Sequence, residues 1–289
     1  MSLMETEETN KFTFEPFASH AFYTDVNRML VQQALAHLVA RPMNARLTIV
    51  DMACGTGAIT RLIAEEIARQ DRLPQTRIVG IDPSAEALRL AASSIRALDL
   101  PVKADFIQGD GTDLQQHVQY ADAVFFCNAI HLIPDKLNTF QQMGSILASG
   151  GIFACNSTFF QGCYVEGTER YYHLWTRRAM SWLRKEHPEV RVSREVKAMA
   201  MQWLAPEQYT EQLQQSGFRK VDAELNQVVM TPDAMRDAGQ YWLFIEGALP
   251  GIPLALGAQA LGVAAYQAAD EMHLSEIPRR WLQLVAQKQ

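Results

Sequence analysis

The sequence of 289 residues is poor in cysteine, and its four cysteines lie far apart. Cys54, Cys127, Cys155 and Cys163 form no C-x-x-C pair, the spacing typical of zinc and redox sites. A metal site and a disulfide framework are therefore both disfavoured, and we predict no metal ligands. Free thiols buried in a reducing compartment are the expected state.

A hydrophobic leader and a long membrane-spanning run are also absent. The first residues, MSLMETEETNK, are acidic and polar, unlike a secretory signal, and MSL resembles a cloning remnant. The longest charge-poor stretch, residues 247–269, contains two prolines and several glycines. This composition favours an apolar helix that is buried or lines a site over a membrane span. We expect a cytoplasmic protein that does not enter the membrane.

The sequence has no excess of basic residues. Its 26 lysines and arginines against 32 acidic residues give a net charge of −6. This balance argues against a broad phosphate-binding surface, so nucleic acid is a disfavoured partner and a small molecule or protein is the expected substrate. The length suits one large domain with insertions or two small domains, and a homodimer is compatible with it.

Short apolar runs alternate with helical patterns through the first half of the sequence. We expect strands at residues 46–52, 76–82, 104–110, 120–130, 151–159, 219–230 and 279–288. Helices are expected at residues 24–40 after a Thr24 N-cap, 59–70, 83–100, 136–149 and 205–218. This alternation indicates a parallel sheet covered by helices on both faces.

Two segments interrupt this pattern and suggest helical insertions. The predicted division is an N-terminal helical lid at 4–40, an α/β core at 41–158, a helical insertion at 159–205, a core helix and strand at 206–230, a second apolar helical insertion at 231–277 and a terminal strand at 278–289. The first insertion is rich in aromatic residues and arginine, which could pack or line an acceptor pocket.

The stretch IVDMACGTGAIT, residues 49–60, predicts a strand, a glycine turn and the start of a helix. Such a turn presents backbone N–H groups to a ligand, and glycine allows close approach because it has no Cβ. Thr60 stands at the third position of the dinucleotide pattern G-x-G-x-x-G, so the turn alone is weak evidence. Asp82, which ends the second strand, adds an acceptor for ribose hydroxyls and favours an adenosine ligand.

Five motifs in order resemble those of the class I S-adenosylmethionine-dependent methyltransferases. They are IVDMACGTGAIT, IVGIDPSAEAL, FIQGDGTDL, ADAVFFCNAIHLIPD and GGIFACNSTF. The resemblance covers residues 47–158, and residues 205–218 and 279–288 resemble the closing elements of the same fold. It implies a doubly wound, mostly parallel seven-stranded sheet of Rossmann-like type, with helical lids. It also implies S-adenosylmethionine as cofactor and S-adenosylhomocysteine as product.

The resemblance implies that the glycine turn surrounds the methionine part of the cofactor. The residues concerned are Asp51, Ala53, Gly55 and Gly57. Ala53 stands where the family usually has a glycine, a departure that its small side chain should tolerate. Asp51 has an alternative role as a cap of the following helix.

The later motifs imply contacts to the rest of the cofactor. Asp82 would bind the ribose beside Pro83 at the adenine, Asp110 and Gly111 would read the adenine edge, and Asn128 would contact the methionine amino group. Each has a structural alternative. Asp82 could be an N-cap, Asp110–Gly111 a turn, and Asn128 a turn at the end of a strand.

The sulfonium of the cofactor is an activated methyl donor, so the protein mainly has to align the donor with the acceptor. His131 lies near the expected methyl-transfer face, and we consider it as a general base or as a packed loop residue. Tyr23 is a candidate lid contact, and His20 a weaker catalytic candidate. We expect methylation of a small, largely apolar metabolite at oxygen or carbon; the alternatives are an RNA or protein methyltransferase and a non-catalytic binding protein.

Overall fold

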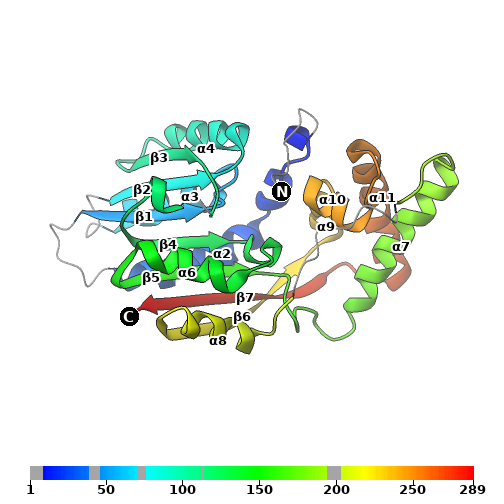
Figure 1. Cartoon of the computed structure of the whole chain (residues 1–289). Helices are drawn as coiled ribbons and strands as arrows, with labels where there is room; N and C mark the ends of the chain where they lie inside the picture. Colours follow the sequence, from blue (N-terminus) through cyan, green and yellow to red (C-terminus); the bar gives the residue numbers. More distant parts are fainter. Residues whose placement is uncertain (1–8, 39–45, 71–75, 112–113, 194–202) are drawn as a thin grey trace. The chain divides into compact units, whose positions relative to one another are not determined.

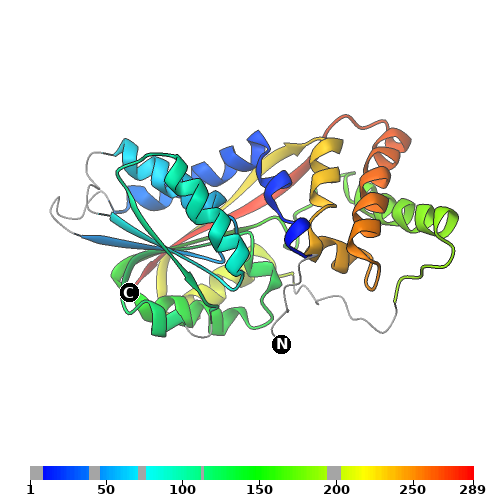
Figure 2. The same ribbon diagram turned by 90° about the horizontal axis from the view of Figure 1, so that it is seen from above.

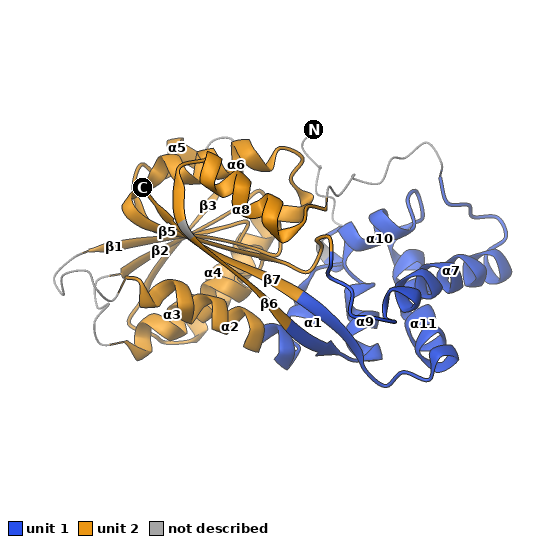
Figure 3. Cartoon of the chain, turned by 90° about the horizontal axis from the view of Figure 1, so that it is seen from below, with its two compact units in different colours: residues 1–24, 162–200, 227–280 blue, residues 25–161, 201–226, 281–289 orange. Residues whose placement is uncertain are grey.

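The computed structural model describes residues 9–38, 46–70, 76–111, 114–193 and 203–289. The chain divides into two compact units, each assembled from distant segments (Figure 3). We call residues 25–161, 201–226 and 281–289 the sheet unit. Residues 1–24, 162–200 and 227–280 form the helical unit.

A seven-stranded sheet with the order β3-β2-β1-β4-β5-β7-β6 runs through the sheet unit (Figure 1). Its strands are β1 (Leu47–Met52), β2 (Thr76–Asp82), β3 (Lys103–Gln108), β4 (Ala121–Cys127), β5 (Leu147–Ser157), β6 (Phe218–Met230) and β7 (Ile277–Lys288). β1 is parallel to β2 and β4, β2 to β3, and β4 to β5, whereas β7 is antiparallel to β5. The predicted doubly wound, mostly parallel sheet is confirmed. Its order reverses between β1 and β4, where such sheets bind ligands at the carboxyl ends of the strands.

Helices cover both faces of this sheet (Figure 3). On one side lie α2 (Ala21–Ala36), α3 (Ala58–Arg69) and α4 (Ala85–Ala97), and on the other α5 (Leu114–His117), α6 (Lys136–Ile146) and α8 (Pro206–Gln215). A 3₁₀ turn, η2 (Ile130–Leu132), follows β4. The expected helices therefore exist, with shifted ends.

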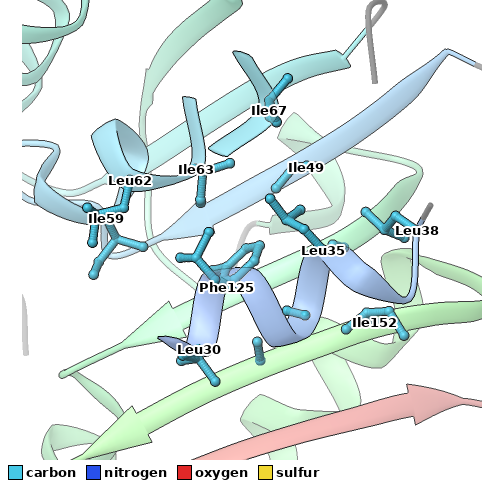
Figure 4. Packing of buried hydrophobic residues seen from close by; sticks show 14 of the residues in the cluster. Leu30, Leu35, Leu38, Ile49, Ile59, Leu62, Ile63, Ile67, Phe125 and Ile152 are labelled. Carbon is cyan, nitrogen blue, oxygen red and sulfur yellow. The ribbon is translucent and has the colours of Figure 1, made fainter. Parts of the chain in front are cut away.

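The hydrophobic core follows from the alternation of side chains along each strand. Leu35 of α2 and Ile63 of α3 meet Ile49 and Phe125 on one face (Figure 4). On the opposite face Phe153 of β5 packs on Phe140 of α6 and Phe218 of β6, with ring centroids 5.6 Å apart in both pairs. Burial of both faces explains why these strands appear as continuous apolar runs in the sequence.

The helical unit contains α1 (Glu15–Ala18), α7 (Glu169–Glu186), α9 (Pro232–Ala238), α10 (Trp242–Ala248) and α11 (Leu254–Met272) (Figure 2). The charge-poor stretch of the sequence begins at the end of α10 and forms most of α11. Alanines of α11, including Ala264 and Ala268, are fully buried, and their small side chains let α7 approach closely. Among the described helices, none meets the length and apolarity needed to cross a bilayer.

Two expected helix ends are wrong. α2 begins at Ala21 rather than after Thr24, because the carbonyl of His20 accepts the N–H groups of Tyr23 and Thr24. α6 ends at Ile146, before the predicted stop at residues 150–151, because Leu147 pairs with Ala121 and starts β5. Pairing within the sheet outweighs the local glycine signal there. Residues 39 and 40 lie outside the described residues.

Gly57 lies at the start of α3, where the glycine turn packs against α4. Its φ of 90° is left-handed, and a Cβ there would lie 2.9 Å from the Cβ of Ala91. Gly57→Ala should therefore lower the free energy of unfolding by about 3 kcal/mol, from backbone strain and overpacking.

A double-mutant cycle in urea checks the Gly57 prediction. Ala91→Gly alone should cost about 1 kcal/mol, the usual penalty for glycine in a helix. It should recover part of the loss when combined with Gly57→Ala. Strict additivity of the two changes would contradict the predicted contact.

Candidate cofactor-binding site

The turn after β1 alternates left-handed and ordinary backbone conformations. Ala53, Gly55 and Gly57 have φ values of 54°, 52° and 90°. The N–H of Gly57 donates to the carbonyl of Cys54 at 2.9 Å, and the N–H of Cys54 donates to Ile81 of β2 at 3.1 Å. A Cβ added at Gly55 would have no atom within 4 Å, so this side of the turn opens onto empty space.

Ala53 shows what its departure from glycine costs. An L-residue in the left-handed region is strained by about 1–2 kcal/mol, a cost that glycine avoids. We expected alanine to fit here because its side chain is small. The structure shows that the cost lies in the backbone conformation instead. The backbone hydrogen bonds of the next residue, Cys54, to Ile81 and Gly57 hold the turn in this conformation.

Asp82 connects the glycine turn to the start of α4. Its Oδ2 accepts a hydrogen bond from the N–H of Gly55 at 2.8 Å, and its Oδ1 accepts one from the N–H of Ser84 at 3.0 Å. The N-cap of α4 is Ser84, whose hydroxyl accepts from the N–H of Ala87 at 2.9 Å. The alternative in which Asp82 is the N-cap is therefore wrong, and its carboxylate is directed at the glycine turn.

Asp51 is buried at the end of β1, with 1% of its surface exposed. The hydroxyl of Thr60 donates to its Oδ2 at 2.5 Å, so the carboxylate holds the first turn of α3. Threonine at the third position of the glycine pattern thus has a structural reason. Burial, with a smaller effect of the nearby Asp82 charge, raises the pKa of Asp51 to about 7, against the lowering effect of the hydrogen bonds from Thr60.

The raised pKa of Asp51 predicts a pH-dependent stability. The unfolded chain releases this proton near pH 4 and the folded chain near pH 7, so the stability contributed at low pH is lost as the pH rises through this window. Asp51→Asn should remove up to about 4 kcal/mol of that decline. Urea unfolding of both proteins from pH 4 to pH 8.5 measures it. Parallel curves for wild type and variant would contradict the prediction.

The carboxyl ends of β2 and β3 are joined beside this turn. The N–H of Gly109 donates to the carbonyl of Asp82 at 3.1 Å, and the side chain of Gln108 donates to the carbonyl of Pro83 at 2.9 Å. Asp110 follows directly and is exposed, with Gly111 next to it. The structure therefore gathers the predicted adenine-side residues at adjacent strand ends.

Asn128 belongs to a cluster of amides at the ends of β4 and β5. It has a φ of 57°, and its N–H donates to the side-chain oxygen of Asn156 at 3.0 Å. Asn27 of α2 accepts from the side-chain amides of Asn156 at 2.8 Å and Asn128 at 3.3 Å. Sequence reasoning missed Asn27 and Asn156. A polar residue at the end of an otherwise apolar strand was the available signal for Asn156.

His131 lies in η2 with 6% of its surface exposed. Its Nδ1 is 3.1 Å from the hydroxyl of Ser157, which also accepts the N–H of Phe159 at 2.9 Å. The ring of Phe159 lies 4.5 Å from the imidazole. These contacts fix His131 against the end of β5, which supports the alternative of a packed loop residue. Its role as a base stays a prediction.

The aromatic and basic residues of the first insertion pack within the helical unit. Tyr171 donates to the carbonyl of Ala265 at 3.0 Å, and Trp175 donates to that of Leu261 at 2.8 Å. Arg178 pairs with Glu271. These contacts favour packing over the alternative of a pocket wall.

Tyr23 is buried, with its ring 5.6 Å from Phe14 and 5.9 Å from Phe17. Its role as a lid contact remains a prediction.

All four cysteines are free and buried, as expected. Within the described ranges no group of three or more histidine, cysteine or acidic side chains could hold a metal ion.

Comparison with known proteins agrees with this geometry. A family model described as a methyltransferase domain matches residues 43–216, more than half of the chain. A probable S-adenosylmethionine-dependent methyltransferase of Saccharomyces cerevisiae is 30% identical over 135 residues, covering 46% of this chain and 43% of that protein. A trans-aconitate 2-methyltransferase of Azoarcus sp. is 34% identical over 125 residues, covering 42% and 44%. The match thus spans less than half of the length of these curated relatives.

Solved structures share the fold at low sequence identity. A putative methyltransferase from Bacillus halodurans has a TM-score of 0.53 at 12% identity, covering 89% of this chain and 98% of that chain. A putative sarcosine dimethylglycine methyltransferase from Galdieria sulphuraria also has a TM-score of 0.53 at 12% identity, covering 91% and 85%. With the family match and the site geometry, these findings place the chain in the class I S-adenosylmethionine-dependent methyltransferases.

Proposed function

We propose that the protein transfers a methyl group from S-adenosylmethionine to a small, largely apolar metabolite at oxygen or carbon. The observation that carries the proposal is the pairing of Gly55 with Asp82: a glycine that opens onto empty space, hydrogen-bonded to a carboxylate at the next strand end. This pairing provides a surface without a side chain next to an acceptor for hydroxyl groups. Both features suit an adenosyl ligand.

In this proposal the glycine turn holds the methionine part of the cofactor. Ala53, Gly55 and Gly57 shape the backbone, and Asp51 supplies a buried acidic group below it. When Asp51 is ionised, its carboxylate favours the sulfonium of the cofactor over the uncharged thioether of the product, because opposite charges attract more strongly at a buried site. Asn128 is assigned to the methionine amino group, at the edge of its amide cluster.

The adenosine end is assigned to the tips of β2 and β3. A carboxylate oxygen can accept more than one hydrogen bond, so Asp82 can bind ribose hydroxyls while it holds the turn. Pro83 lies beside the adenine, and Asp110 and Gly111 read its edge. Tyr23 is retained as the lid contact.

When bound, the cofactor supplies an activated methyl group. The protein has to hold the acceptor in line with that group and exclude water, and positioning of this kind contributes about 7–11 kcal/mol in favourable systems. We assign acceptor recognition to the insertions at 159–205 and 231–277. Relatives named as acting on trans-aconitate and demethylmenaquinone support an acceptor of metabolite size.

Two experiments test the proposal. Calorimetry should show one S-adenosylmethionine site per chain, and absence of binding would refute the proposed function. Incubation with methyl-labelled cofactor and a metabolite extract should place label in the fraction that passes an ultrafiltration membrane. Label retained with RNA or protein would support the alternative substrate classes. Binding without any transfer would support the alternative of a regulatory binding protein.

A further inference from the structure

The amide cluster of Asn27, Asn128 and Asn156 lies at the carboxyl ends of β4 and β5, within the sheet unit. Asn27 of α2 is 0% exposed and Asn156 of β5 is 1% exposed, whereas Asn128 is half-buried. Asp51 of β1 pairs with Phe125 of β4, so the segments that follow these two parallel strands meet at the same edge of the sheet. The amide cluster therefore shares this edge with the glycine turn.

The hydrogen bonds of the amide cluster determine which way each side-chain amide points. A backbone N–H can only donate, so the N–H of Asn128 requires the side-chain oxygen of Asn156 to face it, at 3.0 Å. The nitrogen of the same Asn156 amide then donates to the side-chain oxygen of Asn27 at 2.8 Å. This oxygen also faces the side chain of Asn128, which therefore has to present its NH₂ group, at 3.3 Å. Every orientation thus follows from one backbone donor.

The orientation of the Asn128 amide decides what it can offer to a ligand. Its NH₂ group donates to Asn27, so the carbonyl oxygen of this amide is directed away from Asn27. An oxygen accepts hydrogen bonds, and an ammonium group has donors but no acceptor. The observed orientation therefore suits an ammonium group, whereas the reversed amide would turn two donors toward it.

The helix that carries Asn27 is held against the sheet by a second buried amide. Gln283 of β7 is 1% exposed, and its side-chain nitrogen donates to the carbonyl of Val26, the residue before Asn27. The side-chain oxygen of Gln283 accepts from Asn226 of β6 at 3.0 Å. Buried polar groups cost free energy unless they are hydrogen-bonded, so these bonds favour a single arrangement. The sheet thus fixes the position from which Asn27 acts.

We propose that Asn27 and Asn156 are positioning residues, which turn the side-chain oxygen of Asn128 toward the amino group of the cofactor's methionine part. This inference rests on the proposed assignment of Asn128 to that group. The two positioning residues act through Asn128 and need no contact with the cofactor. Their effect is a selectivity for adenosyl ligands that carry an ammonium group at this end.

Two ligands that differ only in the amino group test this selectivity. They are S-adenosylhomocysteine and its deamino analogue, in which hydrogen replaces the amino group. Calorimetry on the full-length wild type should show about 10–100-fold tighter binding of S-adenosylhomocysteine, as expected for a hydrogen bond that involves a charged group. Equal affinities would overturn the inference and leave the proposed function standing. Absence of binding by either ligand would overturn both.

Two variants of Asn27 separate positioning from a structural role. Asn27→Leu retains the size of the side chain but removes the oxygen that orients Asn128. It should bind S-adenosylhomocysteine about tenfold more weakly, and the deamino analogue as tightly as the wild type does. Asn27→Asp keeps an oxygen toward both amides, whether or not it is protonated, and should retain the selectivity. Equal weakening of both ligands in Asn27→Leu, or lost selectivity in Asn27→Asp, would overturn the inference.

Two further variants complete the experiment. Gln33→Leu is the matched control, since Gln33 is on the same helix but its amide donates to Glu224, at 3.2 Å. It should keep the wild-type selectivity, and a loss as large as that of Asn27→Leu would count against the amide cluster. Asn27→Ala, with its smaller side chain, takes the place of Asn27→Leu if circular dichroism shows that the latter does not fold. It should show the same selective loss, and equal weakening of both ligands would again overturn the inference.

Discussion

Replacing Asp82 with alanine should weaken S-adenosylmethionine binding about 100-fold. Hydrogen bonds to a charged acceptor contribute about 1.5–3 kcal/mol each, and this carboxylate is proposed to accept from the ribose. It also holds the N–H of Gly55 at 2.8 Å and that of Ser84 at 3.0 Å, so its loss would loosen the turn as well. Calorimetry measures the change directly.

The Asp82 experiment has a matched control in the same sheet. Asp105 of β3 accepts from Arg77 at 2.6 Å in a partly exposed ion pair. Asp105→Ala should leave cofactor affinity unchanged, because partly exposed pairs contribute little beyond their own site. Asp82→Asn should lie between wild type and alanine, since the amide keeps one accepting oxygen. Equal affinity of wild type and Asp82→Ala would refute the ribose assignment.

Replacing Gly55 with alanine should lower the same affinity at least tenfold and leave the chain folded. The added Cβ meets no protein atom within 4 Å, so it would enter the space assigned to the cofactor. Forcing a methyl group into a packed contact costs about 1–3 kcal/mol. The left-handed φ of 52° adds strain to the folded state, but Ala53 already occupies that region at 54°. Calorimetry and thermal unfolding together measure the two effects.

Gly167 separates backbone strain from blocked binding. It is in the helical unit, has a φ of 83°, and its added Cβ would also meet nothing within 4 Å. Gly167→Ala should lower stability by about 1–2 kcal/mol through the same strain. Its cofactor affinity should stay unchanged. If Gly55→Ala binds the cofactor as tightly as Gly167→Ala does, the glycine turn does not hold the ligand.

Several features of the site could be predicted from local sequence, and others depend on distant partners. The strand, the glycine turn and Asp82 were predictable because apolar runs and glycines report on burial and backbone freedom nearby. The amide cluster was not, since Asn27 and Asn156 are 129 positions apart and meet only in the folded chain. The partner of His20 was hidden for the same reason, with 217 positions between it and Asp237.

The sequence by itself determined the alternation of buried strands and helices, the order of the motifs and the family to which the chain belongs. Hydrophobic periodicity and glycine placement are local properties, so they can be read without knowing the fold. Only the tertiary structure decided that α6 ends at Ile146, that Ser84 rather than Asp82 caps α4, and that the aromatic residues of α7 pack against α11. The end of α6 and the packing of α7 depend on contacts between segments that folding brings together, and Asp82 is engaged by the N–H of Gly55, 27 positions away. In these places tertiary packing overrides local preference.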